Sequence, residues 1–246
     1  MLQNKIVLIT GATGGIGTAL CKSFAKEKAT IIINYLQNDI EANKIKEQLF
    51  SQYQTDSMLL KANISDEQEV KNMIDKIIDN YHKIDVIINN AGIAFDSLIE
   101  DKTSISFQKI LSTNLIGPFL VSKYASKYMP SGSSIINISS TNAIDSYYPY
   151  SLDYDASKAG LNNLTHNLAC AYAPKIRVNA ICPGWVETKM NQSLTKEFKN
   201  KELSKILLER FATPEEIANV ALFLASPSAS YINSSIIKVD GGIKIN

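Results

Sequence analysis

Short runs of apolar and β-branched residues alternate along this chain with longer segments of helical length. Such runs are typical of parallel strands buried on both faces, and the alternation is typical of βαβ units. Strands are predicted at residues 6–9, 30–33, 57–60, 86–88, 134–138, 178–181 and 236–239. Helices are predicted at about 15–27, 39–53, 66–81, 104–128, 154–173, 190–208 and 214–225. The pattern indicates an α/β fold, a doubly wound parallel sheet of about seven strands with helices on both faces.

Length and composition favour one globular unit over residues 1–246, with 45% apolar and 20% charged residues. The formal net charge of +1 gives no overall attraction to nucleic acid or to an anionic membrane, so neither is expected as a partner. Three dispersed cysteines and two histidines predict no disulfide framework and no metal site. The first apolar run is too short for a signal peptide or membrane span, and we expect a cytoplasmic protein.

Two predicted helices carry recognisable start signals. Ser65 with Gln68 fits a capping box at the third helix. Thr213 supplies a cap for the last helix, followed by Pro214 at the first helical position and Glu216 at the third. We therefore expect helices to begin at both places.

The first strand runs directly into a glycine-rich loop at residues 10–17 and then into a helix. Glycines there allow backbone N–H groups to approach a pyrophosphate, which also meets the positive end of the helix. The spacing is GxxxGxG, and a turn that needs glycine only for packing is the alternative. The predicted cofactor contacts of this loop are Gly11, Thr13, Gly14, Gly15, Ile16 and Gly17.

The second strand ends in Asn34-Tyr35-Leu36, where the adenosine ribose of a bound dinucleotide is expected. No carboxylate stands there to bind a ribose 2′-hydroxyl and repel a 2′-phosphate, so NADP(H) is favoured over NAD(H). No Arg or Lys stands there to neutralise that phosphate either. Asp39 lies nearby and is interpreted as a solvated residue at a helix start.

Tyr154 and Lys158 are one helical turn apart and face the same way. An ammonium beside a phenol favours its ionised form and lowers a pKa that starts near 10, which makes a proton donor usable near neutral pH. Alone, the pair could be an exposed tyrosine and a solvated lysine. Ser139 and Ser140 at one predicted strand end, and residues 89–92 at another, strengthen the catalytic interpretation.

In order and spacing, these motifs resemble the short-chain dehydrogenase/reductase family over essentially the whole chain. The matching motifs are residues 10–17 and 89–92, Asn114, Ser140, Tyr154 with Lys158, Pro183 with Gly184, and residues 239–242. Residues 177–184 and 211–218 look most like the bacterial 3-oxoacyl-acyl carrier protein reductases. The resemblance implies a single Rossmann-type domain that binds a nicotinamide cofactor.

The resemblance also implies a division of catalytic work. Tyr154 would give a proton to the carbonyl oxygen of the substrate, and Ser140 would hydrogen-bond that oxygen. Lys158 would bind the nicotinamide ribose and lower the pKa of Tyr154, while Asn114 would hold a water that links Lys158 to solvent. Two alternatives stay open: Ser139 could be the catalytic hydroxyl, and Asn114 could merely cap or bend its helix.

Further cofactor contacts are implied at the strand ends and in a loop over the nicotinamide. They are Asn34, Tyr35, Asn63, Ile64, Asn90, Ala91, Gly92, Tyr154, Lys158, Pro183, Gly184, Val186 and Thr188. Residues 186–212 are expected to form a substrate lid, whose part 189–210 has a surplus of three positive charges. That surplus could attract an anionic substrate or mark a solvated helix. Trp185 could pack in the lid hinge or border the substrate cavity.

The resemblance implies an NADP(H)-dependent reductase of a 3-oxoacyl thioester, with acyl carrier protein as a candidate partner. Two departures weaken this assignment: the aromatic loop 141–153 is one residue longer than usual, and the basic grip on the carrier is reduced to Lys175. The alternatives are a dehydrogenase of a sugar, polyol or other small alcohol, and a non-catalytic cofactor-sensing regulator. A homotetramer or homodimer is expected, packed through residues 104–128, 154–173 and 236–245.

Overall fold

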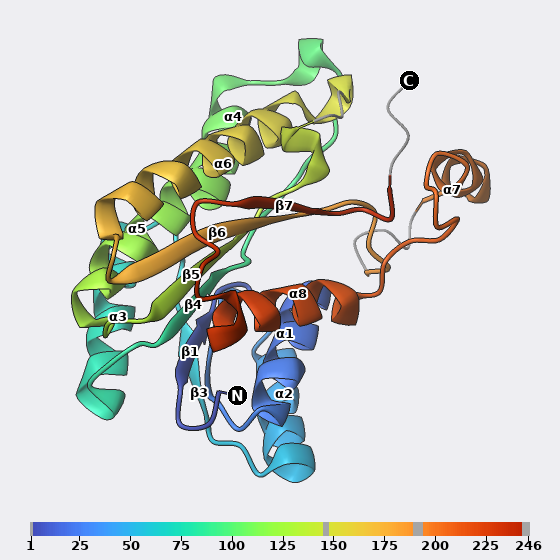
Figure 1. Cartoon of the computed structure of the whole chain (residues 1–246). Coiled ribbons are helices and arrows are strands. Elements are labelled where there is room, and N and C mark those ends of the chain that lie inside the picture. Colours follow the sequence, from blue (N-terminus) through green and yellow to red (C-terminus); the bar gives the residue numbers. More distant parts are fainter. Residues whose placement is uncertain (1, 145–147, 189–193, 243–246) are drawn as a thin grey trace.

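The computed structural model describes residues 2–144, 148–188 and 194–242, and contains one seven-stranded parallel sheet. The strand order β3-β2-β1-β4-β5-β6-β7 reverses direction between β1 and β4, as a doubly wound sheet does (Figure 1). The strands are β1 (Ile6–Ile9), β2 (Thr30–Tyr35), β3 (Ser57–Lys61), β4 (Val86–Asn89), β5 (Ser133–Ile138), β6 (Ile176–Pro183) and β7 (Ile236–Val239). The predicted fold class is confirmed, and each predicted strand is present.

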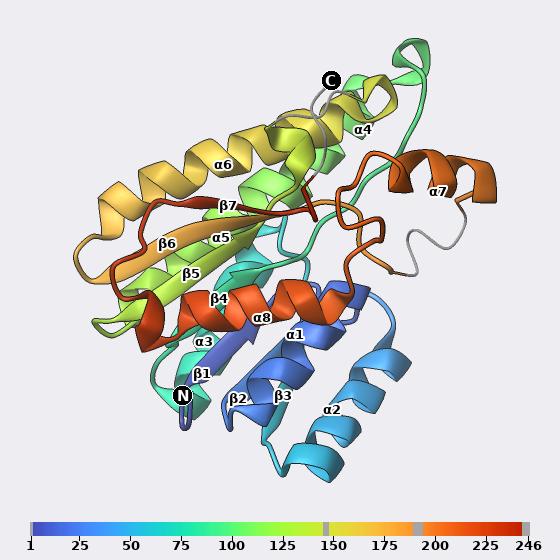
Figure 2. The same ribbon diagram turned by 45° about the vertical axis from the view of Figure 1, so that its right-hand side comes forward.

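Helices cover both faces of the sheet (Figures 1 and 2). One face carries α1 (Gly15–Lys26), α2 (Asp39–Tyr53) and α8 (Pro214–Ala225). The other carries α3 (Glu67–Tyr81), α4 (Ser104–Leu111), α5 (Gly117–Ala125) and α6 (Leu152–Tyr172). Because alternate residues of each strand point to opposite faces, the sheet separates two apolar cores, one around Phe24 and Ile33 and the other around Ile32 and Ile74. Burial of both faces explains why the strands are continuous apolar runs.

Two predicted helix details differ from the structure. The helix expected over residues 104–128 is divided into α4, a π-helical turn at Ser112–Ile116, α5 and a final 3₁₀ turn at Ser126–Tyr128. The cap of α3 is Asp66, whose carboxylate accepts from the Glu69 N–H at 2.9 Å, so the prediction of a Ser65 cap was wrong by one residue. The capping box of Thr213 with Glu216 is confirmed.

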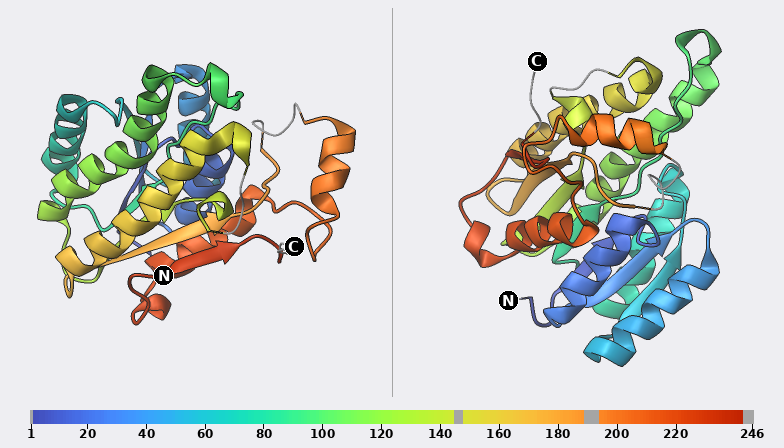
Figure 3. Two further views of the ribbon diagram at one scale, coloured as in Figure 1. Left: turned by 90° about the horizontal axis from the view of Figure 1, so that it is seen from above. Right: turned by 90° about the vertical axis from the view of Figure 1, so that its right-hand side faces the viewer.

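The segment between β6 and α8 leaves the sheet beyond the carboxyl ends of β6 and β7 (Figure 2). Its base is closed by an isolated bridge between Val186 and Ala212, the two ends of the predicted lid. Within it, the described helix α7 (Lys196–Leu203) is shorter than predicted, and residues 189–193 lie outside the described part of the chain. The right-hand view of Figure 3 looks toward this end of the molecule, where α7 projects from the body. Among the described residues, no helix has the length and apolar character needed to cross a membrane.

Candidate active site

The glycine loop is held against the carboxyl end of β4 by a side-chain hydroxyl. The Thr10 oxygen accepts hydrogen bonds from the N–H groups of Asn90 and Ala91 at 3.0 and 3.1 Å. In return, the Asn90 side chain donates to the carbonyls of Thr10 and Gly11, both at 3.0 Å. Gly11 has φ of +60°, and a Cβ on it would lie 2.7 Å from the Cα of Ala91. The close approach of the two segments therefore requires glycine at position 11.

The start of α1 could hold the pyrophosphate of a dinucleotide. Gly14 is its N-cap, no side chain caps the helix, and its first turn contains no acidic residue. A Cβ on Gly17 would lie 2.4 Å from the Gly11 carbonyl oxygen, so the loop folds this tightly only with glycine there. Uncapped N–H groups at the positive end of a helix bind phosphates, and the residues present fit such a group. Thr188, from the segment after β6, lies over Gly15, where a Cβ would approach its Cγ2 to 2.8 Å.

Four predicted catalytic residues meet beside β4 and β5. Tyr154 and Lys158 lie in the first turns of α6, with Lys158 Nζ 5.6 Å from the centroid of the Tyr154 ring. Ser140, two residues beyond β5, lies near enough to the phenol of Tyr154 for its hydroxyl to lower the pKa of that group. A Cβ on Gly92 would lie 3.4 Å from both Lys158 Nζ and Asn114 Oδ1. The structure thus brings together residues from four separate segments of the chain.

Burial dominates the pKa values of Tyr154 and Lys158. Burial around its hydroxyl raises the pKa of Tyr154 to about 12, against the opposing effect of the Ser140 hydrogen bond. Burial also lowers the pKa of Lys158 to about 8, and its Nζ donates to the Ile138 carbonyl at 2.8 Å. Burial is the largest influence on both pKa values, and the lowering of the Tyr154 pKa by Lys158 stays a prediction. Tyr154 is a protonated donor at neutral pH.

The neighbouring serine and Asn114 have structural bonds of their own. The Ser139 hydroxyl donates to the backbone carbonyl of Lys158 at 3.2 Å, which fastens α6 to the end of β5. The fully buried Asn114 lies in the π-helical turn, where its side chain accepts from the N–H of Ile93 and donates to the Ile93 carbonyl. Its amide also donates to the Ser157 hydroxyl at 3.0 Å. Asn114 therefore links the irregular turn to both the segment after β4 and the catalytic helix.

A buried ion pair outside the sequence prediction lies next to Tyr154. Lys102 Nζ is 2.7 Å from Asp153 Oδ1, and both side chains are at most 5% exposed. The same nitrogen donates to the Phe95 carbonyl, and the same carboxylate oxygen accepts from the Tyr154 N–H. The pair joins the segment after β4 to the first turn of α6. No local sequence signal marks it, because 51 residues separate the partners.

The end of β2 has a second feature that the sequence did not show. Tyr35 is paired in register with Lys61 of β3, which brings a cation beside it. Lys61 Nζ lies 2.9 Å from Asp39 Oδ2, and the Tyr35 hydroxyl donates to Asp39 Oδ1 at 3.0 Å. The Lys61 hydrogen bond, followed by that of Tyr35, lowers the pKa of Asp39. Asp39 is the first residue of α2 and is 57% exposed, as predicted, and it is also bonded to both neighbours. The parallel register is the signal that locates Lys61.

Other predicted cofactor residues lie along the same carboxyl edge. Asn34 is buried, and its amide donates to the carbonyls of Leu60 and Ala62. The Asn63 oxygen accepts from the N–H and hydroxyl of Ser65, so this predicted cofactor contact is already bonded within its own loop. The remaining predicted contacts in this group occupy the end of β3, the end of β6 and the segment beyond it: Ile64, Pro183, Gly184 and Val186.

Comparisons with known proteins agree with this geometry. Residues 11–244 match a family described as enoyl-(acyl carrier protein) reductase. The chain is 38% identical over 247 residues to the 3-oxoacyl-[acyl-carrier-protein] reductase FabG of Thermotoga maritima, covering 99% of each. A short-chain dehydrogenase from Burkholderia cenocepacia, solved in complex with NADP, superposes with a TM-score of 0.93 at 26% identity, covering 98% of both chains. The chain belongs to the short-chain dehydrogenase/reductase family.

Membership in the short-chain dehydrogenase/reductase family makes the protein a nicotinamide-dependent oxidoreductase of CH–OH and C=O groups. The predicted family and enzyme class are confirmed, which removes support for a non-catalytic regulator. A second relative has a different substrate in its name: the glucose 1-dehydrogenase 2 of Bacillus subtilis is 32% identical over 250 residues, covering 99% of this chain and 96% of the relative. Family membership alone therefore leaves the substrate open.

A small pocket lies at the start of the catalytic helix α6. Tyr148, Pro149, Leu152 and Asp155 line a pocket of about 280 Å³ at the start of α6. Tyr148 and Tyr150, two of the predicted aromatic residues, have ring centroids 5.2 Å apart, whereas Tyr147 lies outside the described residues. The hollow gives the short-chain reductase an aromatic and acidic surface beside its catalytic helix.

Trp185 packs in the hinge of the predicted lid. Its ring stacks on Phe211 at a centroid distance of 5.6 Å and meets the edge of Phe198, and its indole N–H donates to Glu202. Of the five cations described in this segment, three are in ion pairs: Lys199–Glu187, Lys205–Glu202 and Arg210–Glu216. These contacts reduce the net positive field that the sequence predicted for the lid.

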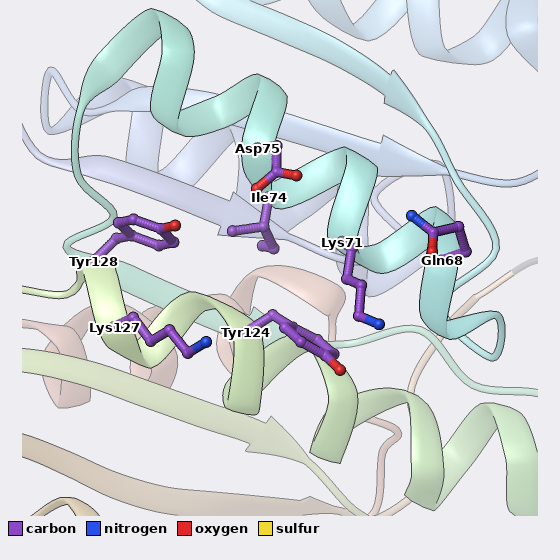
Figure 4. A pocket seen from close by; sticks show the side chains of 7 residues that line it. All are labelled: Gln68, Lys71, Ile74, Asp75, Tyr124, Lys127 and Tyr128. Atoms are coloured by element: carbon purple, nitrogen blue, oxygen red, sulfur yellow. The ribbon is translucent and has the colours of Figure 1, made fainter.

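A separate pocket of about 240 Å³ lies between α3 and the end of α5, away from the residues assigned to the reductase site (Figure 4). Its lining is Gln68, Lys71, Ile74, Asp75, Tyr124, Lys127 and Tyr128. Lys71 Nζ lies 5.2 Å from the centre of the Tyr124 ring, and Tyr124 also donates to Glu67. This hollow contains none of the catalytic residues that the family motifs identify.

Proposed function

We propose that this protein is an NADP(H)-dependent reductase that converts the carbonyl of a 3-oxoacyl thioester to an alcohol. The observation that carries the proposal is the convergence of the Ser140 hydroxyl and the phenol of Tyr154 next to the buried ammonium of Lys158. A protonated phenol and a hydroxyl that converge on one point suit a carbonyl oxygen that gains negative charge and then a proton. The similarity to the Thermotoga maritima reductase over 99% of both chains supports the substrate class.

In this proposal the chain's residues orient the carbonyl and deliver a proton. A nicotinamide cofactor, when bound, supplies the hydride. Ser140 donates a hydrogen bond to the carbonyl oxygen, and Tyr154 transfers its hydroxyl proton to that oxygen as charge develops there. Lys158 lies close enough to stabilise the tyrosinate that remains. Asn114 fixes the position of α6 through its hydrogen bond to Ser157, and in this way it helps to position Tyr154 and Lys158.

The NADP(H) preference is supported by the end of β2, where Asn34 and Tyr35 stand in place of a carboxylate at the strand terminus. We expect isothermal titration to give tighter binding of NADPH than of NADH to the wild-type protein. The two ligands are in the same redox state and differ only in the 2′-phosphate. The ratio of their dissociation constants therefore measures recognition of that phosphate. Tighter binding of NADH would contradict the proposed cofactor.

The substrate proposal is tested by a panel of carbonyl compounds and alcohols. With NADPH, we expect acetoacetyl thioesters to be reduced with a higher kcat/KM than diketones, and crotonyl thioesters to be inert because the site holds a proton donor for an oxygen atom. Glucose and polyols, offered with NADP and with NAD, should be turned over more slowly. The measurement is the change in nicotinamide absorbance. Inactivity on acetoacetyl thioesters together with turnover of a sugar would reject the assignment.

A sugar or polyol dehydrogenase is the second candidate, favoured by two observations. The relative from Bacillus subtilis is named a glucose dehydrogenase. The pocket beside α6 combines Tyr148 with the Asp155 carboxylate, and such groups hydrogen-bond to hydroxyl-rich molecules. The same panel separates the two candidates, because one substrate carries a thioester and the other carries neighbouring hydroxyls.

The proposed partners are acyl carrier protein and further copies of this chain. The lid still contributes Lys196 and Lys201, and Lys175 follows α6, but the ion pairs of the lid make its attraction to an acidic carrier weaker than the charge count predicted. Exposed apolar side chains on α4 and α5, including Ile105 and Phe119, support self-association through residues 104–128. A cytoplasmic location is consistent with these partners.

A further inference from the structure

The backbone and side chain of Asn34 form hydrogen bonds that connect the carboxyl ends of β1, β2 and β3. The Ala12 N–H, in the glycine loop, donates to the Asn34 carbonyl at 2.9 Å. The Asn34 amide donates to the carbonyls of Leu60 and Ala62 at 3.2 and 3.1 Å, on either side of Lys61. A dinucleotide whose pyrophosphate lies at the glycine loop extends its adenosine half over β2. Strand β3 lies beside β2 (Figure 2), and Lys61 is its last residue, next to the expected position of the ribose.

The ion pair between Lys61 and Asp39 is exposed, so Lys61 can leave Asp39 for another anion. The Lys61 and Asp39 side chains are 55% and 57% exposed, and a solvated pair of this kind adds little to stability. The opposite oxygen of Asp39, at the start of α2, already accepts a hydrogen bond from the Tyr35 hydroxyl, which holds the carboxylate against that side chain. A phosphate carries more negative charge than a carboxylate and forms stronger charge-assisted hydrogen bonds with an ammonium. Lys61 can therefore move from Asp39 to a nearby phosphate at small cost.

We propose that Lys61 supplies the positive charge that binds the 2′-phosphate of NADP, and that Asp39 competes with this phosphate for Lys61. The inference rests on the proposed NADP(H)-dependent function and names the residue that recognises the cofactor. It resolves the lack of a cation in the sequence of β2, because the cation comes from the adjacent strand. With NAD, which has no 2′-phosphate, Lys61 stays with Asp39 and adds no binding.

The test compares ligands that differ only by the 2′-phosphate. Isothermal titration measures the dissociation constants of adenosine 2′,5′-bisphosphate and of 5′-AMP for the wild-type protein and for Lys61→Met. We expect this substitution to weaken the bisphosphate about 10-fold or more, the loss of a charge-assisted hydrogen bond, with 5′-AMP affected less than about 2-fold. NADPH and NADH should show the same contrast.

Asp39→Asn gives the opposite expectation. It frees Lys61 and removes a negative charge near the phosphate, so the bisphosphate should bind several-fold more tightly while 5′-AMP is nearly unchanged. Lys28→Met is the matched control, since Lys28 is an exposed lysine at the opposite end of β2 whose Nζ donates to the Tyr53 carbonyl. It changes the net charge equally and should leave both affinities as in the wild-type protein.

Equal effects of Lys61→Met on both nucleotides, or no effect on either, would overturn the inference. The result is separable from the proposed cofactor preference, which the wild-type protein alone tests with NADPH and NADH. If the wild type bound NADH more tightly while Lys61→Met still weakened only the bisphosphate, the preference would fail and the role of Lys61 would stand. If the wild type preferred NADPH and Lys61→Met had no effect, the role of Lys61 would fail alone.

Discussion

Replacement of Tyr154 by Phe should reduce kcat for carbonyl reduction by about 10²–10⁴-fold, the contribution typical of a positioned general acid. Phe retains the ring that packs near Lys158 but lacks the hydroxyl that Ser140 contacts. The proton for the product alcohol would then have to come from water. The measurement is steady-state turnover of the best substrate in the panel, at saturating cofactor.

The dissociation constant of NADPH and the unfolding temperature should stay close to their wild-type values in Tyr154→Phe. These controls distinguish a lost proton donor from a damaged fold or cofactor site. Ser139→Ala is a useful companion, because the Ser139 hydroxyl bonds to the Lys158 backbone and should affect turnover much less than Ser140→Ala. Near-normal turnover of Tyr154→Phe would refute the proposed mechanism.

Replacement of Lys102 by Met should lower the free energy of unfolding by about 3–5 kcal/mol, as expected when one partner of a buried ion pair is removed. Asp153 is 1% exposed, so its charge would stay in the protein interior without its cation. The Phe95 carbonyl would lose its ammonium donor as well. Urea unfolding followed by circular dichroism, at one fixed protein concentration, measures the change.

Two further variants separate the buried charge from general effects of the substitution. Adding Asp153→Asn to Lys102→Met removes the uncompensated charge but retains an acceptor for the Tyr154 N–H, so it should recover part of the lost stability. Lys199→Met removes a lysine from an exposed pair and should cost only a small fraction of the Lys102 effect. A Lys102→Met protein as stable as Lys199→Met would show that the buried pair does not stabilise the fold.

The strand and helix pattern was readable from the chain because burial on both faces leaves a local trace. Four apolar residues at Ile6–Ile9, followed by a glycine loop, are typical of the first strand and turn of such a sheet. The helix boundaries that the local pattern did not locate have identifiable physical causes. Asp66, and not Ser65, caps α3. Asn114 stabilises a π-helical turn through hydrogen bonds to a distant segment.

The sequence by itself determined the fold class, the family and the residues that carry the motifs. Each depends on residue types and on their order and spacing along the chain. Only the tertiary structure decided what those residues meet: Lys61 beside Asp39, Lys102 beside Asp153, and the paired charges of the lid. The tertiary structure also decided the protonation of Tyr154 and Lys158, because removal from water depends on all the atoms around a group and not on its neighbours in the chain.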